Sequence, residues 1–305
     1  MNWKPRSALV AAVIGLALTA AACGSSPSTG STTPKGTITV AGFKFSEGSV
    51  LAELYGQALQ HDGYTVTFKL NLGSREVVAP AIKSSQVDLY IGYAATDLEF
   101  YNNSAGEASG DVTATTAKLN SHLQPLNLVA LNPSSAVDQN AFAMTKANST
   151  KYNATKLSDL AAIGGQLVLG AGPECPTRPF CQPGLQKTYG INFKSFKALD
   201  TDGPLTRAAL KNNDIQVGLV FSSDADLSSL GLVTLQDDKH LENADNVVPI
   251  VRTPVATSEV KKVLNAVSAG LTTADLVNLN SQVELQHMDP DVVTKAYLQQ
   301  HNYFS

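Results

Sequence analysis

Residues 64–93, YTVTFKLNLGSREVVAPAIKSSQVDLYIGY, decide the fold of this chain because they read as strand, glycine turn, helix and strand. Apolar and polar side chains alternate from Val66 to Leu72 and again from Val87 to Ile91, which is the period of β-strands. Gly73 predicts the turn between them and Ser74 a helix cap. The helix that follows presents an apolar face made of Val77, Val78, Ala81 and Ile82.

This strand–helix–strand unit also predicts where a ligand binds. Parallel strands joined by a helical crossover gather ligands beyond their carboxyl ends. Tyr90, Tyr93 and Thr96 lie near or after the end of the second strand and are expected to emerge at that edge. We therefore expect the binding site there.

The first 22 residues have the composition of an export signal. Lys4 and Arg6 precede an apolar run over residues 8–22, which is shorter than the roughly 18 residues that span a bilayer. The segment LTAAAC resembles a bacterial lipobox, which predicts that Cys23 becomes the lipidated first residue of a protein held on the outer face of the cell membrane. Plain secretion after Ala22 is the alternative.

The other two cysteines, Cys175 and Cys181, stand close together in CPTRPFC. An exported chain meets an oxidising compartment, so we expect them to form a disulfide, which leaves Cys23 as the odd cysteine that a lipid explains. We expect no metal, because two thiols need further ligands and the histidines show no ligand spacing. No cofactor is expected.

Composition narrows the class of partner. Residues 24–36, GSSPSTGSTTPKG, lack apolar periodicity, so residues 23–36 are expected to be a flexible tether. The net charge is −4, and the sequence contains no stripe of basic residues. Both features argue against nucleic acid as a partner. We expect a monomer.

Strand and helix patterns alternate along the rest of the chain, which is typical of an α/β fold. The segment VALNPSSAVDQNAFAMTK, residues 129–146, reads as two extended pieces around a polar turn and predicts a crossing between domains. The pattern places residues 37–136 and 243–305 in domain I and residues 137–242 in domain II. Two doubly wound domains joined by two extended crossings predict hinge closure around a ligand.

These segments, read in order, give the chain from Gly36 onward a family resemblance. It resembles the ProX-like substrate-binding proteins of osmoprotectant ABC transporters, which bind glycine betaine, choline and proline betaine. The resemblance rests on Phe45-Ser46-Glu47, LNLGSREV, VDLYIGY, DQNAFAMTK, LSDL, GPE, GLQKTYG, ALKNNDIQVG, SSD and LQDDKH. It implies a two-lobed periplasmic-binding-protein fold (type II-like), a small solute, an ABC permease as partner, and no catalysis.

The resemblance also implies a box of aromatic faces around a quaternary ammonium, which cannot donate hydrogen bonds and is held by cation–π attraction. Carried over by motif, the expected walls are Tyr93, Phe142 and Phe221. The expected polar contacts are Thr96, Asn140 and Arg178.

Three positions depart from the family pattern. Arg207 and Asp245 stand where tyrosines are usual, and Phe43 with Lys44 beside it replaces a lysine. Arg207 in the cleft would repel a cation, so these substitutions favour a neutral, polyhydroxylated or aromatic solute over a betaine. An ion pair between Arg207 and Asp245 across the cleft is the alternative.

Two other functions are open to the sequence. A surface-anchored protein could keep the fold and bind an altered ligand without any import role. An exported hydrolase needs a nucleophile and a base, but the chain has no GxSxG, no HExxH and no glycine-rich phosphate loop.

Overall fold

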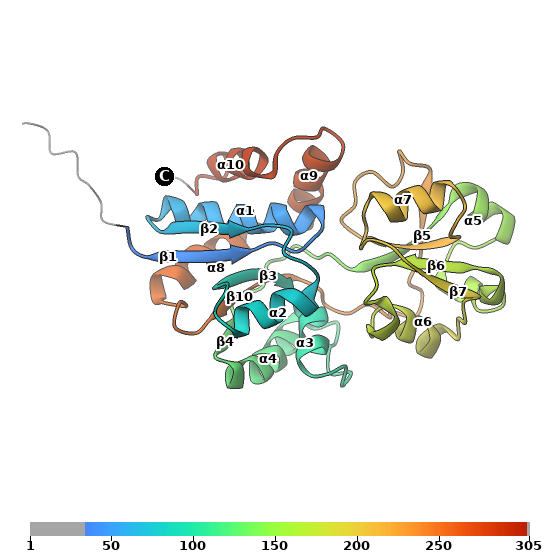
Figure 1. The fold of residues 1–305 in the computed structure, drawn as a ribbon, viewed down its shortest axis with the longest axis horizontal. Coiled ribbons are helices and arrows are strands. Elements are labelled where there is room, and N and C mark those ends of the chain that lie inside the picture. The colour runs from blue at the N-terminus through green and yellow to red at the C-terminus, as the bar shows by residue number, and fades with distance from the viewer. Residues whose placement is uncertain (1–33, 304–305) are drawn as a thin grey trace, which may run out of the picture. The chain divides into compact units, whose positions relative to one another are not determined.

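Two five-stranded sheets organise residues 34–303, the part of the chain that this computed structural model describes. The export signal, Cys23 and the tether up to residue 33 lie outside the described residues. Each sheet carries helices on both faces, and we call the two resulting bodies lobe I and lobe II (Figure 1). The α/β two-lobed architecture predicted from the sequence is confirmed.

Lobe I contains the sheet β2-β1-β3-β10-β4. β1 is parallel to β2 and to β3, and β10 lies antiparallel between β3 and β4. Its strands are β1 (Thr37–Ala41), β2 (Thr65–Lys69), β3 (Leu89–Tyr93), β4 (Leu128–Ala130) and β10 (Val247–Arg252). Its helices are α1 (Ser46–His61), α2 (Arg75–Lys83), α3 (Ala94–Tyr101), α4 (Val112–Leu123), α8 (Ser258–Gly270), α9 (Thr273–Glu284) and α10 (Pro290–Gln300).

Lobe II contains the sheet β7-β6-β8-β5-β9, in which β6 is parallel to β7 and β8 while β5 is antiparallel to its neighbours. Its strands are β5 (Asn140–Thr145), β6 (Val168–Ala171), β7 (Ser195–Ala198), β8 (Val217–Phe221) and β9 (Leu232–Leu235). Its helices are α5 (Lys146–Tyr152), α6 (Gln182–Tyr189) and α7 (Pro204–Lys211). Alternating residues of β5 and β8 face separate cores on the two sides of the sheet.

Two extended crossings connect the lobes, residues 131–139 between β4 and β5 and residues 236–246 between β9 and β10. The crossings touch, because Val137 and Asn246 form an antiparallel bridge and the Asp138 amide donates to the Asp245 carbonyl at 3.1 Å. The domain boundaries at 136/137 and 242/243 stay a prediction.

The segment that predicted the fold forms β2, α2 and β3, with local differences. β2 ends at Lys69 rather than at Leu72, and Val77 is 48% exposed, so it does not belong to the buried face of α2. Ser74 occupies the cap position of α2, but its hydroxyl donates to Glu76 at 2.6 Å instead of capping a backbone amide. Within residues 34–303, no helix is long and apolar enough to cross a membrane.

Candidate ligand-binding site

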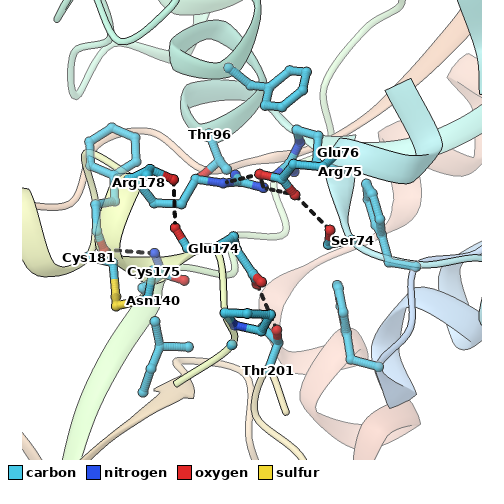
Figure 2. A pocket seen from close by; sticks show the side chains of 18 of the residues that line it. Ser74, Arg75, Glu76, Thr96, Asn140, Glu174, Cys175, Arg178, Cys181 and Thr201 are labelled. Carbon is cyan, nitrogen blue, oxygen red and sulfur yellow. Dashed lines mark hydrogen bonds and ion pairs between the residues drawn. A yellow bond between two sulfur atoms is a disulfide. The ribbon is translucent and has the colours of Figure 1, made fainter. Parts of the chain in front are cut away.

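A cavity of about 630 Å³ lies where the parallel strands of both sheets end (Figure 2). Tyr93 is the last residue of β3 and Phe221 the last of β8, and both line it. β5 runs antiparallel to β8, so its first residue, Asn140, is paired with Phe221 at the same edge. The cavity therefore lies beyond the carboxyl ends of the strands, where the sequence placed the site.

Four aromatic rings form one wall of the cavity, and Phe45 is the central one. The ring of Phe45 lies 5.7 Å from Phe43, 5.1 Å from Phe221 and 6.5 Å from Tyr93, measured between centroids. Phe43 and Tyr93 come from lobe I and Phe221 from lobe II, so the group spans both lobes. The sequence had not assigned Phe45 to the site, although it belongs to a motif that carries the family resemblance.

A buried ion pair supports this wall from behind. Arg75 donates through Nε to Asp97 at 2.6 Å, and its guanidinium lies 5.1 Å from the centre of the Phe43 ring. Burial lowers the pKa of Arg75, but Asp97 more than offsets it and raises the pKa above its ordinary value. Tyr90 also donates to Asp97, at 2.9 Å, and is fully buried, so it does not emerge at the site as predicted.

An ion pair between the lobes crosses the cavity. Arg178 of lobe II donates through Nε and a terminal nitrogen to both carboxylate oxygens of Glu76 in α2, at 2.9 and 3.0 Å (Figure 2). Burial raises the pKa of Glu76, but the hydrogen bonds from Arg178 and Ser74 outweigh it and lower the pKa to about 2. The Arg178 guanidinium also lies 5.5 Å from the Phe100 ring.

A disulfide closes the loop that carries Arg178. Cys175 and Cys181 are bonded, which confirms the predicted pairing. The loop is tied to β5, because the Asn140 amide donates to the Phe180 carbonyl at 2.9 Å. The disulfide therefore holds part of the cavity wall in lobe II.

Thr96 and Asp245 meet at the cavity, and both were predicted as site residues. Asp245 accepts from the Thr96 amide at 2.7 Å and from its hydroxyl at 2.5 Å. Burial raises the pKa of Asp245 to about 6, and the hydrogen bonds from Thr96 oppose that rise. At neutral pH this side chain is therefore a carboxylate facing the ligand space.

Of the ten ligand-contact residues predicted from the sequence, eight line the cavity. They are Phe43, Lys44, Tyr93, Thr96, Asn140, Arg178, Phe221 and Asp245. Phe142 does not line the cavity. It lies two residues after Asn140 in β5, is 1% exposed and packs into the core of lobe II.

Arg207 is the second correction. It lies on α7, where its side chain pairs with Asp202, Asp224, Asp226 and Glu284. It is not among the residues that line the cavity. The alternative pairing with Asp245 is also wrong, because the guanidinium of Arg207 lies among those four carboxylates and Asp245 accepts from Thr96 instead.

Glu47 connects the aromatic wall to lobe II. One carboxylate oxygen accepts from the Tyr93 hydroxyl at 2.5 Å, and the other accepts from Ser223 and from Asn280 of α9, each at 2.6 Å. Burial raises the pKa of Glu47, against the effect of these hydrogen bonds. Glu47 belongs to the same motif as Phe45, and the sequence had given it no role.

Two lobes that enclose a cavity at the carboxyl ends of their strands define the class of two-lobed solute-binding proteins. A family model described as the substrate binding domain of ABC-type glycine betaine transport system matches residues 36–300, and the chain belongs to this family. A small-molecule ligand and an ABC permease are therefore its partners.

Proteins similar to this chain match it over most of their length. The glycine betaine-binding protein YehZ of Escherichia coli is 26% identical over 84% of this chain and 87% of its own length. A glycine-betaine-binding protein of Pseudomonas aeruginosa is 27% identical over 87% and 88%. A crystal structure described as a glycine betaine/carnitine/choline ABC transporter has a TM-score of 0.67 at 22% identity, covering 88% of this chain and 100% of that one, and it supports the fold.

Proposed function

We propose that this chain is an exported solute receptor that binds a small quaternary-ammonium solute between its lobes and passes it unaltered to an ABC permease. The wall formed by Phe43, Phe45, Tyr93 and Phe221 carries this proposal. A quaternary ammonium has no hydrogen to donate, and the faces of aromatic rings attract it through their quadrupole.

The charges around the cavity support a ligand with a positive group. Six carboxyl side chains line it: Glu76, Glu99, Asp138, Glu174, Asp200 and Asp245. Glu76 is already paired with Arg178, and burial raises the pKa of Asp138 well above its ordinary value, so the other four support this reading. Of the three basic side chains there, Arg75 is paired with Asp97, Arg178 with Glu76, and Lys44 is exposed. Arg207 lies elsewhere, so the repulsion that the sequence predicted does not act on a bound cation.

One basic group is placed to meet the other end of such a solute. Lys44 stands exposed among the lining residues and is able to attract the carboxylate of a betaine, whereas Arg178 is already held by Glu76. Choline would instead use hydrogen-bonding groups such as Asn140 and Thr201. The relatives named for glycine betaine support this class of ligand.

We further infer that the mature chain is a monomer, anchored to the outer face of the membrane by a lipid on Cys23. The lipobox-like LTAAAC segment supports the lipid anchor. The lobes are proposed to close by rotation at the two crossings, with domain I comprising residues 37–136 and 243–305 and domain II residues 137–242. No turnover of the solute is proposed.

A neutral polyhydroxylated or aromatic solute is the second candidate. It is favoured by Asp245, whose carboxylate takes the place of an expected aromatic wall and is able to accept hydroxyl hydrogen bonds. In this case the protein would be a surface-anchored binder without an import role.

Isothermal titration calorimetry separates the two candidates. Residues 23–305, produced without the export signal and carrying Cys23→Ser, would be titrated with choline, glycine betaine and carnitine, and separately with panels of polyols and polyphenols. Saturable binding of a quaternary-ammonium solute is expected. Binding confined to the neutral panels would replace the first candidate with the second, and no heat from any compound would refute both. Uptake of the bound solute in cells with and without the gene then tests import.

A further inference from the structure

Five charged side chains gather where the lobes meet outside the ligand cavity. Arg207 of α7 lies 2.6 Å from Asp226, 3.2 Å from Asp202 and 3.4 Å from Asp224, measured between nitrogen and oxygen atoms. Glu284 lies 3.9 Å from the same guanidinium. We call these five residues the interlobe charge cluster.

The cluster is divided unequally between the lobes. Asp202, Arg207, Asp224 and Asp226 all follow or belong to elements of lobe II. Glu284 is the last residue of α9 and belongs to lobe I. Opening of the lobes would therefore separate one carboxylate from a group that already holds three carboxylates and a single arginine.

The side chain of Glu284 is mostly covered and lacks a strong partner. Its side chain is 9% exposed, and its Oε2 atom is buried without a hydrogen bond among the described residues. Asp226 likewise has one buried oxygen, Oδ1, that accepts nothing there. One arginine cannot neutralise four carboxylates. An excess of buried negative charge is unfavourable unless a proton or another cation neutralises part of it.

We propose that Glu284 and the lobe II part of this cluster form a proton-linked lock, in which contact between the lobes takes up a proton that separated lobes release. This inference rests on the proposed closure of the lobes around a ligand. Protonated Glu284 adds no negative charge to the cluster and is able to donate a hydrogen bond to it. Burial and the neighbouring Asp224 raise the pKa of Asp202 well above its ordinary value, so ionised Glu284 is repelled by Asp224 and Asp226, and acid favours the closed arrangement.

The direction of the pH effect follows from the groups that face Glu284. Burial and the charges of Asp224, Asp226 and Glu47 raise its pKa to about 7, and Arg207 opposes them. In separated lobes water surrounds the carboxyl group, and its pKa is about 4.3. The closed arrangement therefore gains stability as the pH falls from above 7, and the gain is complete below about pH 4.3. Between pH 8 and pH 6 one such group changes the ratio of closed to open molecules about tenfold.

A divalent cation is the competing way to relieve the charge. Carboxylate oxygens of Asp202, Asp224 and Glu284 lie within 4.8 Å of one another, which is a spacing that a calcium ion can bridge. However, a terminal nitrogen of Arg207 already contacts Asp202 and Asp224 and faces Glu284. A guanidinium in this place repels a metal ion, so the geometry favours the proton.

Distances between spin labels in the ligand-free protein test the lock. Cysteines would replace the exposed Lys83 of lobe I and Lys187 of lobe II in the Cys23→Ser chain, and pulsed electron–electron double resonance would be recorded from pH 8 to pH 6. We expect the short-distance population to rise about tenfold relative to the long one as the pH falls. Glu284→Gln should show the short distance at every pH, and Glu259→Gln, an exposed change on α8, should behave as the parent.

Each contrary result is distinct. An equal pH response in Glu284→Gln and the parent, or one fixed distance at every pH, would overturn the lock. A response abolished by EDTA and restored by calcium would replace it with a metal site. Titrations of the same samples with choline and glycine betaine test the proposed ligand separately. If the distances follow the pH but neither compound binds, the lock stands and the proposed ligand is wrong. If a compound binds but the distances do not respond to pH, the proposed ligand stands and the lock is wrong.

Discussion

Replacing Phe45 with alanine is the sharpest perturbation of the proposed ligand wall. The Phe45 ring is within 6.5 Å of three other rings, so its removal deletes one cation–π contact and leaves Phe43, Tyr93 and Phe221 without their common neighbour. Phe45 is half-buried, and a partly desolvated cation–π contact contributes about 1–2 kcal/mol, which corresponds to roughly 5- to 30-fold weaker binding of choline or glycine betaine. Calorimetry at pH 7.5 measures this directly.

The control is a phenylalanine that packs equally against a core but outside the cavity. Phe193 is half-buried against the core of lobe II and does not line the cavity. Phe193→Ala should lower the midpoint of thermal unfolding and leave affinity within about twofold, while Phe45→Tyr should restore most of the binding that alanine loses. Unchanged affinity in a folded Phe45→Ala protein would refute the aromatic wall as the ligand contact.

Three further changes test other parts of the structure. Arg207→Tyr should reduce the free energy of unfolding in urea by about 3–5 kcal/mol at pH 7.5, and less at pH 5, because it leaves buried carboxylates unpaired; a protein of parental stability would contradict the cluster. Reduction of the Cys175–Cys181 disulfide should cost about 2 kcal/mol for a separation of 6 residues, read as a lower unfolding midpoint with reductant, and an unchanged midpoint would show that the loop needs no bond. Glu76→Gln should speed dissociation of choline several-fold in stopped-flow displacement, because it weakens the bidentate hold on Arg178 between the lobes; equal dissociation rates would show that this pair does not retain the ligand.

Local patterns predicted the strands and the edge at which the cavity lies. Alternation of apolar residues placed β3, and the rule for parallel sheets then brought Tyr93 to the edge where the cavity lies, whereas Phe221 at the end of β8 was assigned by the family resemblance. Phe45 escaped this reasoning because it lies between β1 and α1, where no periodic pattern extends. Its position two residues after Phe43 was the available signal, since alternate residues of an extended segment share a face.

The charge contacts were not predictable in the same way. Arg207 and Glu284 are far apart in sequence. They meet because α9, which belongs to lobe I, ends beside the segment that follows β8 in lobe II. Position in a motif placed Arg207 in the ligand cavity, whereas the nearby carboxylates determine where its side chain lies. Phe142 shows the same limit, because it lies two residues after Asn140 along β5 and is already in the core rather than at the cavity edge.

The central claim is that an aromatic, acidic cavity between the lobes selects a quaternary ammonium by its charge. Calorimetry that compares choline with its neutral carbon isostere, in which a tert-butyl group replaces the trimethylammonium, tests this most directly. The two molecules share shape and apolar area, so the account predicts at least about tenfold tighter binding of choline. Equal affinity for the two, or tighter binding of the isostere, would contradict it.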